Sequence, residues 1–240
     1  MAKTRQIPWM NIVAESGAII ASILLAFWID AWWESRNELD LEREQLLSMR
    51  EEFTANLEAL ELLNETINEH SSNIEEFIRI LKAAGDEPVV VPDYLLRSAI
   101  MWRTSDISTS TLDALMASGS LNVLRNAELR IKLAGLPAVV RDLTEDEELS
   151  KNFAESVMAE FVVREGFAEI AYANRMLELK PNFQALGVAS EIAVDPSPEL
   201  IGLLAARRVH FGYAEDGFPK VLSYLSELII DINKELERQR

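Results

Sequence analysis

The chain has 240 residues, of which 49% are hydrophobic, and this is enough for one sizeable core. Residues 35–240 carry 21 basic and 37 acidic side chains, a net charge of −16, and so acidic a region makes binding to nucleic acid unfavourable. The chain contains no cysteine, which excludes disulfides, thiolate catalysis and cysteine-based metal sites.

Residues 12–33 (IVAESGAIIASILLAFWIDAWW) predict a transmembrane helix. Their uncharged core, residues 16–29, has only 14 residues, whereas a bilayer crossing needs roughly 20. Tryptophans, which favour the headgroup level of a membrane, extend both ends. Trp9 precedes the core, and Trp28, Trp32 and Trp33 close it. The helical distance from Trp9 to Trp32 is about 34 Å, which matches a bilayer and its interfaces.

The flanks of this span predict its orientation. Residues 1–11 contain Lys3 and Arg5 and no acid, and the positive-inside rule therefore places them in the cytoplasm. Residues 34–240 would then form an acidic domain in the periplasm, with the chain crossing a bacterial inner membrane once. A cleaved signal peptide is the alternative, but bulky rings crowd the cleavage region and Glu15 interrupts the apolar run.

One face of the predicted span is built from small residues. Its members are Ala14, Ala18, Ser22 and Ala26 at four-residue steps, with Gly17 and Ala21 beside them. Such a stripe allows another helix to approach closely in lipid, so we expect a packing face. Asp30 continues the stripe and Glu15 lies next to it. The two acids either mark the water boundaries, or Glu15 pairs with a group on a neighbouring helix.

Beyond the span, apolar residues repeat every seven positions and predict one long helix that ends before Gly85. The repeat consists of Leu39, Leu46, Phe53, Leu60, Ile67 and Ile74. The stretch Asn64–Asn73 is rich in weak helix formers, so a bend or break is expected there. Residues 85–92 predict a loop with a short extended valine run, and no strand-rich segment follows.

Capping residues predict a series of shorter helices in the middle of the chain. Asp93 would cap a helix to Arg103, and Ser110–Asp113 resembles a capping box that opens a helix to Ala117. Gly119 would end that helix in the left-handed conformation. Asn126 would cap a helix that continues towards Val140 and is kinked at Gly135 and Pro137.

A second capping box, Thr144–Glu147, predicts a further helix through about Leu179. Residues 181–196 predict an irregular region. Ser197-Pro198-Glu199 is typical of a helix start, and the last helix would run to the C-terminus with a kink or break at Gly217 and Pro219. The fold class predicted is therefore all-α: one N-terminal transmembrane helix plus an antiparallel helical bundle with a long first helix.

No catalytic or metal site is predicted. His70 lacks a second histidine or a glutamate at ligand spacing, and the acidic run Glu145–Glu148 lacks the alternation and glycine of a calcium loop. There is no phosphate-binding glycine loop and no Gly-x-Ser-x-Gly motif. We therefore expect no cofactor and no enzymatic activity.

Two stretches together, residues 14–37 and residues 109–133, resemble a family of bacterial single-span membrane proteins of unknown function. The matching positions are Glu15, Asp30, Trp33, Thr111, Leu115, Ser118, Gly119, Leu121, Asn126, Leu129 and Arg130. Asp30 departs from the asparagine expected there. The resemblance implies a membrane anchor and a helical domain outside the cytoplasm, and it implies no activity. Read on its own, the second stretch predicts a structural helix–turn–helix corner in which Arg130 bonds to the carbonyls of residues 118–120.

These features favour a non-enzymatic, membrane-anchored accessory or scaffold subunit. Its partners would be the lipid bilayer and other transmembrane helices, either those of a larger complex or those of further copies of itself. A respiratory or photosynthetic complex is one conceivable host, although no residue identifies it. The alternative is an extracytoplasmic sensor or ligand-binding module, and an enzyme ranks third.

Overall fold

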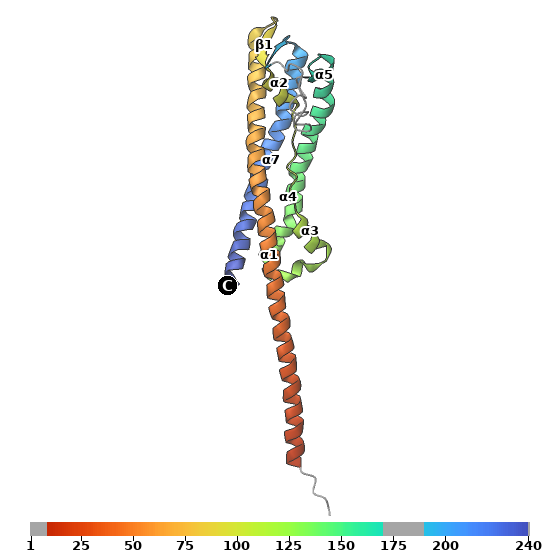
Figure 1. Cartoon of the computed structure of the whole chain (residues 1–240), viewed down its shortest axis with the longest axis vertical. Helices are drawn as coiled ribbons and strands as arrows, with labels where there is room; N and C mark the ends of the chain where they lie inside the picture. The colour runs from red at the N-terminus through yellow and green to blue at the C-terminus, as the bar shows by residue number, and fades with distance from the viewer. Residues whose placement is uncertain (1–8, 170–189, 240) are drawn as a thin grey trace, which may run out of the picture.

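The computed structural model describes residues 9–169 and 190–239, except for the side chains of residues 9–16. The fold is all-α with a long first helix, as predicted (Figure 1). The elements in chain order are α1 (Trp9–Ala84), β1 (Val89–Pro92), α2 (Asp93–Ile100), α3 (Ser110–Ala117), the 3₁₀ helix η1 (Ser120–Val123), α4 (Ala127–Asn152), the π-helical segment η2 (Phe153–Met158), α5 (Ala159–Arg164), β2 (Glu191–Val194) and α7 (Pro198–Arg238).

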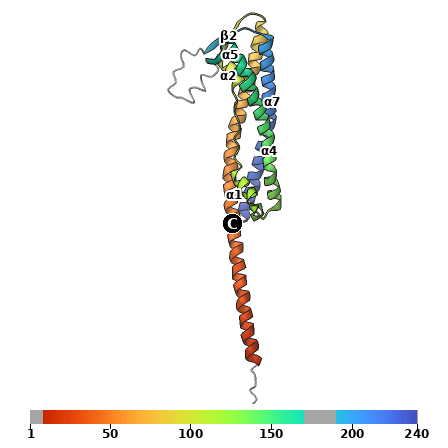
Figure 2. The same cartoon turned by 90° about the vertical axis from the view of Figure 1, so that its right-hand side faces the viewer.

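The helix α1 is continuous over 76 residues, so the predicted span and the first bundle helix are one element (Figure 2). The helix is not broken at Asn64–Asn73, where a bend or break was expected. Packing outweighs the weak local propensity there, because Ile67 and Ile74 are buried against the bundle. His70 Nδ1 and Asn73 Nδ2 also lie 3.1 and 3.0 Å from Ser98 Oγ on α2. Burial lowers the pKa of His70.

The last helix, α7, lies between α1 and α4 and packs on both (Figure 1). It runs antiparallel to each of them. Along α1, Arg43 donates to the Leu236 carbonyl near the end of α7, and the later His70 stacks on the earlier Phe211. Along α4, Lys132 meets Tyr224, and Asn126, just before the helix, meets Glu235. The heptad residues predicted from the sequence form much of the core on α1, with Leu46, Phe53 and Leu60 at most 1% exposed. On α7 the matching stripe includes Leu225, Leu228 and Ile232.

The predicted helix start at Thr144 and the predicted break at Gly217 and Pro219 are wrong. The helix α4 continues through Gly135, Pro137 and Thr144, and the Thr144 hydroxyl donates to the Val140 carbonyl (3.0 Å) instead of opening a new helix. It passes through η2 into α5. The predicted continuation through about Leu179 is wrong in its described part, because α5 ends at Arg164 and Gly166 follows with φ +78°. Residues 170–179 lie outside the described residues. The helix α7 likewise continues through Gly217 and Pro219.

Glycines mark close approaches between helices instead of breaks. A Cβ built on Gly135 would lie 2.5 Å from Tyr224 Oη, and one on Gly217 would lie 2.9 Å from Leu143 Cδ1. The Tyr224 hydroxyl donates to the Lys132 carbonyl (2.7 Å). Because neither position carries a Cβ, α4 and α7 can approach closely, with the backbone of one helix packed against a side chain of the other.

The 101–109 connector, which joins α2 to α3, has no regular structure and is fixed by polar side chains of the long helices. The Arg207 guanidinium on α7 donates to the carbonyls of Ala99 (3.0 Å) and Met101 (2.6 Å). Glu147 on α4 accepts from the Ser105 backbone N–H (3.1 Å). Asn56 on α1 binds both the N–H (3.1 Å) and the carbonyl (2.7 Å) of Ser108. The helix α2 ends at Ile100, before the predicted Arg103.

Arg207 is the largest fully buried side chain among the described residues. It also donates to the Ser150 carbonyl and hydroxyl, both at 2.7 Å, and its guanidinium stacks 4.0 Å from the Phe211 ring centre. Burial lowers the pKa of Arg207 to about 9. The charge is thus solvated by carbonyl dipoles and an aromatic face.

A two-stranded antiparallel sheet closes the end of the bundle farthest from the span. β1 pairs with β2, with Val90 opposite Ala193 and Val91 opposite Ile192. The valine run was predicted as extended, but its partner lies in the region predicted as irregular. Asp93 does not cap α2 with its side chain. It forms an ion pair with Arg97 instead.

Candidate functional site at the span-proximal end

The N-terminal part of α1 projects from the bundle (Figure 1), and its apolar side chains from residue 17 onwards are exposed. An 18-residue stretch reaches a mean hydropathy of 1.4 and none of it is buried, so this helix is long and apolar enough to span a membrane. The predicted packing residues Gly17, Ala18, Ala21, Ser22, Ala26 and Asp30 are all exposed along it. The side chains of Trp9, Ala14 and Glu15 lie outside the described residues.

The aromatic end of this stretch lies close to the bundle. Trp28, Trp32 and Trp33 are 65%, 54% and 60% exposed, and the rings of Trp32 and Trp33 lie 6.4 Å apart. Bundle contacts begin within the next three turns of α1, where Glu38 and Glu42 meet Arg125. The indole cluster and the base of the bundle are therefore neighbours along a single helix.

The N-terminus of α3 is held by a carboxylate from α1. Glu52 accepts hydrogen bonds from the backbone N–H groups of Ser110 (2.6 Å) and Thr111 (3.0 Å) and from the hydroxyls of Ser108 and Ser110. Burial acts to raise the pKa of Glu52, but these hydrogen bonds outweigh it and lower that pKa to about 2. The predicted capping box is wrong: the cap residue is Thr109, whose hydroxyl donates to Asp113.

The corner after α3 follows the sequence prediction in part. Leu115 is buried, and Gly119 adopts φ +68°, the left-handed conformation that glycine takes without strain. The Ser118 hydroxyl donates to the carbonyls of Ala114 and Leu115. Leu121 packs against the core.

Asn126 caps α4, because its Oδ1 accepts from the backbone N–H groups of Glu128 (3.0 Å) and Leu129 (3.1 Å). Leu129 is buried. The prediction for Arg130 is wrong: its guanidinium bonds to the carbonyls of Leu124 (2.5 Å) and Arg125 (3.2 Å), which are nearer along the chain than residues 118–120.

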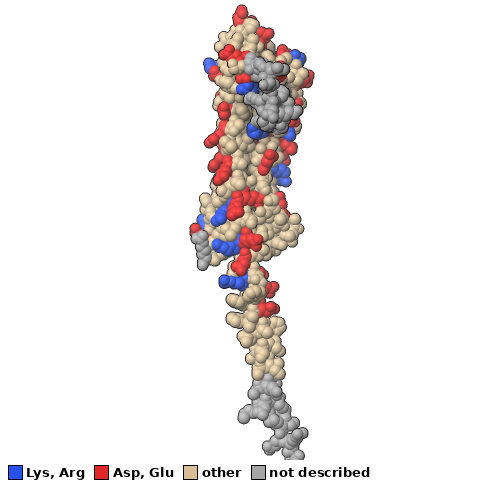
Figure 3. Space-filling view, viewed as in Figure 1, with Lys and Arg blue, Asp and Glu red and all other residues tan. Residues whose placement is uncertain are grey.

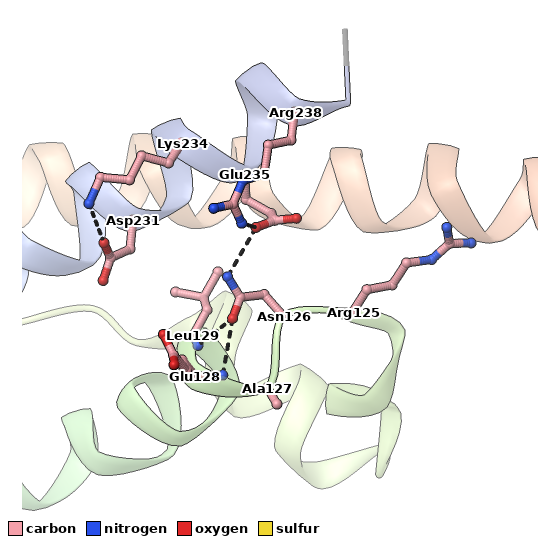
Figure 4. Close-up of a pocket in the computed structure, with 9 residues that line it drawn as sticks. All are labelled: Arg125, Asn126, Ala127, Glu128, Leu129, Asp231, Lys234, Glu235 and Arg238. Atoms are coloured by element: carbon pink, nitrogen blue, oxygen red, sulfur yellow. Dashed lines mark hydrogen bonds and ion pairs between the residues drawn. The ribbon is translucent and has the colours of Figure 1, made fainter.

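The amide nitrogen of Asn126 links the corner to α7. Asn126 Nδ2 donates to Glu235 Oε2 (3.0 Å), and Glu235 also pairs with Arg238 (3.1 Å). These groups line an open cleft between the start of α4 and the end of α7 (Figure 4), and its volume is about 560 Å³. Lys234 and Asp231 line the same cleft.

An adjoining cleft of about 410 Å³, here called the basal pocket, lies between α1 and the end of α7. It is lined by Arg36, Leu39, Asp40, Glu42, Arg43, Arg125, Glu235, Arg238 and Gln239. Glu42 is 1% exposed; one of its oxygens accepts from the Arg125 backbone N–H (2.6 Å). Its other oxygen, Oε2, has no hydrogen-bond partner within the described part of the chain, and neither does the side-chain amide of Gln239.

Charge is distributed unevenly over the molecule. In Figure 3 the projecting part of α1 shows few charges, acidic side chains are scattered over the visible face of the bundle, and basic side chains lie among acids at the end of the bundle from which α1 projects. Four arginines line the basal pocket against three carboxylates. This end can therefore bind a ligand that carries both signs of charge.

Sequence reasoning located the corner but missed the carboxylates that organise it. Glu52, Glu42 and Glu235 are three of many acids in an acidic chain, and their partners lie 58, 83 and 109 positions away. No local signal distinguishes them from solvated acids. The described residues hold no cluster of three or more histidine, cysteine, aspartate or glutamate side chains suited to a metal ion.

Comparison of the chain with protein-family models, with curated proteins and with solved structures gives no match.

Proposed function

We propose that this chain is a non-enzymatic, single-pass accessory or scaffold subunit of a membrane protein assembly. The N-terminal segment would lie in the cytoplasm, residues 12–33 would cross the inner membrane of a bacterium, and the acidic bundle would lie in the periplasm. The subunit would dock through its small-residue face and through the bundle.

The observation that carries this proposal is the continuity of α1. One helix carries exposed apolar side chains along its first part and the buried core of the bundle along its second. A partner helix that packs on the span in lipid would therefore fix the position of the whole bundle, because no joint separates the two parts.

The test is purification of the tagged full chain from its native membrane in mild detergent, with mass spectrometry of the proteins recovered with it. Ala26→Leu adds bulk to the small-residue face and should lower the recovery of the partner several-fold. Ala31→Leu makes the same change on another face of the helix and should leave recovery unchanged. Recovery of the chain alone and monomeric under every condition would refute the docking role.

The membrane topology has its own test. The protein should resist extraction by alkaline carbonate, and a reporter fused after Arg240 should be active only outside the cytoplasm. A chain that carbonate releases from vesicles, or a cytoplasmic reporter, would contradict the anchor whatever the partner.

A further inference from the structure

The basal pocket combines a cationic rim with buried polar atoms, Glu42 Oε2 and the Gln239 amide, that make no hydrogen bond within the described residues, although Arg125 Nε lies 3.9 Å from Glu42 Oε2. The four arginines that line it come from α1, from the segment before α4 and from the end of α7. Of these, Arg43 donates only weakly, to the Leu236 carbonyl at 3.4 Å, and Arg125 lies 3.8 and 3.9 Å from Glu38 and Glu42. At these distances the guanidinium groups keep donors free for a further acceptor.

The pocket also contains buried polar atoms whose hydrogen-bonding capacity is not used within the described residues. Glu42 Oε2 and the Gln239 amide are shielded from solvent and make no hydrogen bond with the described residues. A buried carboxylate oxygen without a donor is unfavourable, and a cationic N–H group is the partner that compensates it best. The pocket thus suits a small group in which an anion and an ammonium lie close together.

The position of the pocket along α1 indicates which molecule would supply a group with both charges. Arg36 lies three residues beyond Trp33, or about 4.5 Å along the helix, and Arg43 lies about 15 Å beyond it. Tryptophans at the end of a span mark the headgroup level, and the headgroup layer is about 5–7 Å thick on each side of the hydrocarbon core. The lower rim of the pocket therefore meets the headgroups of any bilayer that α1 crosses.

We propose that the basal pocket binds the headgroup of a phospholipid that carries a phosphate and a primary ammonium, such as phosphatidylethanolamine, from the outer leaflet of the bilayer that α1 spans. The phosphate accepts from Arg36 and Arg238 at the rim, and the ammonium donates to Glu42 Oε2. The acyl chains remain in the bilayer beside the tryptophan cluster. This proposal rests on the membrane span of the proposed function, but it needs no protein partner.

The experiment reconstitutes the full chain into bilayers of phosphatidylcholine that contain a minor fraction of phosphatidylethanolamine, and it counts the lipids retained after gentle extraction by native mass spectrometry. The chain should retain one phosphatidylethanolamine in preference to phosphatidylcholine by about tenfold, as expected for charge-assisted hydrogen bonds. Retention of all headgroups in proportion to their abundance would overturn the proposal.

Matched variants separate the pocket from overall charge. Arg36→Gln with Arg238→Gln should lower phosphatidylethanolamine retention about tenfold. The control variant, Lys82→Gln with Arg79→Gln, should leave phosphatidylethanolamine retention unchanged. It is matched to the first variant because it also removes one exposed basic residue and one arginine that pairs with a glutamate three positions earlier, but it lies at the far end of the bundle. Equal losses in both double variants would mean that net charge is responsible, and would overturn the site.

Glu42→Gln tests the ammonium contact. Its carbonyl can still accept from the Arg125 N–H, so the fold is preserved, but an amide N–H₂ replaces the oxygen that faces the ammonium. The preference over phosphatidylcholine should disappear while total lipid retention persists. An unchanged preference would refute the assignment of Glu42.

Two further measurements distinguish a failure of the lipid site from a failure of the membrane span. If soluble glycerophosphoethanolamine binds the detergent-solubilised chain as tightly as the lipid does, the pocket takes a free zwitterion and the lipid proposal is overturned. Carbonate extraction of the same vesicles reports on the anchor independently. A resistant chain without lipid preference therefore refutes the pocket alone, and a chain that is extracted refutes the span.

Discussion

At the scale of single residues, buried or partly buried polar side chains that are distant in the sequence hold the backbone in place of local caps and turns. Glu52 holds the first turn of α3, and Asn56 and Glu147 hold the connector before it. Each side chain makes more than one hydrogen bond, so its removal leaves at least one backbone group and a further polar group without that partner. Stability should therefore depend on a few polar residues of the long helices as much as on apolar core volume.

Glu52→Gln should destabilise the protein by about 1 kcal/mol at neutral pH, as for the loss of a helix cap. The pKa of Glu52 falls from 4.5 to about 2 in the folded state, so the contribution of its charge is complete above pH 4.5 and is lost as the pH falls towards 2. Denaturation of the wild type and the variant should thus converge between these values. Glu51→Gln, the exposed neighbour, is the control and should show no such convergence.

Arg207→Ala should destabilise the protein by about 3–5 kcal/mol, because it removes the buried cationic donor that serves the carbonyls of Ala99, Met101 and Ser150. Arg208→Ala on the same helix removes ion pairs with Glu75 and Glu215 that solvent screens, and it should cost less than about 1 kcal/mol. Chemical denaturation in detergent measures both. Similar losses at the two positions would contradict the special role of the buried guanidinium.

At the scale of elements, the sequence predicts which segments are helical better than where helices end. The seven-residue repeat from Leu46 to Ile74 indicates the buried face of α1, because burial of that face stabilises the helix. The apparent stops at Asn64–Asn73, Thr144 and Gly217 are local preferences only, and tertiary contacts override each of them. Thr144 satisfies its hydroxyl on Val140, and Gly217 gives room to Leu143.

The contacts that place the connector and the basal pocket could not be predicted in this way. The sequence shows that Glu42, Glu52 and Asn56 lie on α1, but their partners are set by the return of the chain after residue 100. Serine and threonine between residues 104 and 111 are typical of a turn, yet here they supply donors for carboxylates on two helices. Pairing across such separations is a property of the packed bundle.

The packing of α4 on α7 gives a prediction at this scale. Gly135→Ala would place its methyl group 2.5 Å from Tyr224 Oη, and it should destabilise the protein by about 1–3 kcal/mol. Tyr224→Phe removes the clashing oxygen, and the next ring atom, at 3.7 Å, is in ordinary contact. The double variant should therefore be more stable than the sum of the single changes predicts, and simple additivity in a double-mutant cycle would contradict the proposed contact.

At the scale of the whole molecule, the described structure is a rod whose axis is α1. Spin labels at Asn37→Cys and Lys82→Cys can be introduced without background, because the chain has no cysteine. An unbroken helix places these positions about 68 Å apart, and pulsed dipolar spectroscopy should give a single narrow distance near that value. A bend at Asn64–Asn73 would shorten and broaden the distribution.

Because α1 is unbroken, a rotation of its N-terminal part would also rotate the bundle. Ala84 lies about 77 Å along the helix from Trp33, and spanning helices are commonly tilted by about 20°. If α1 crosses a bilayer as proposed, a change in tilt of that size would displace the far end of the bundle sideways by about 26 Å. A force on the membrane-spanning part of α1 would therefore produce a much larger displacement at the far end of the bundle.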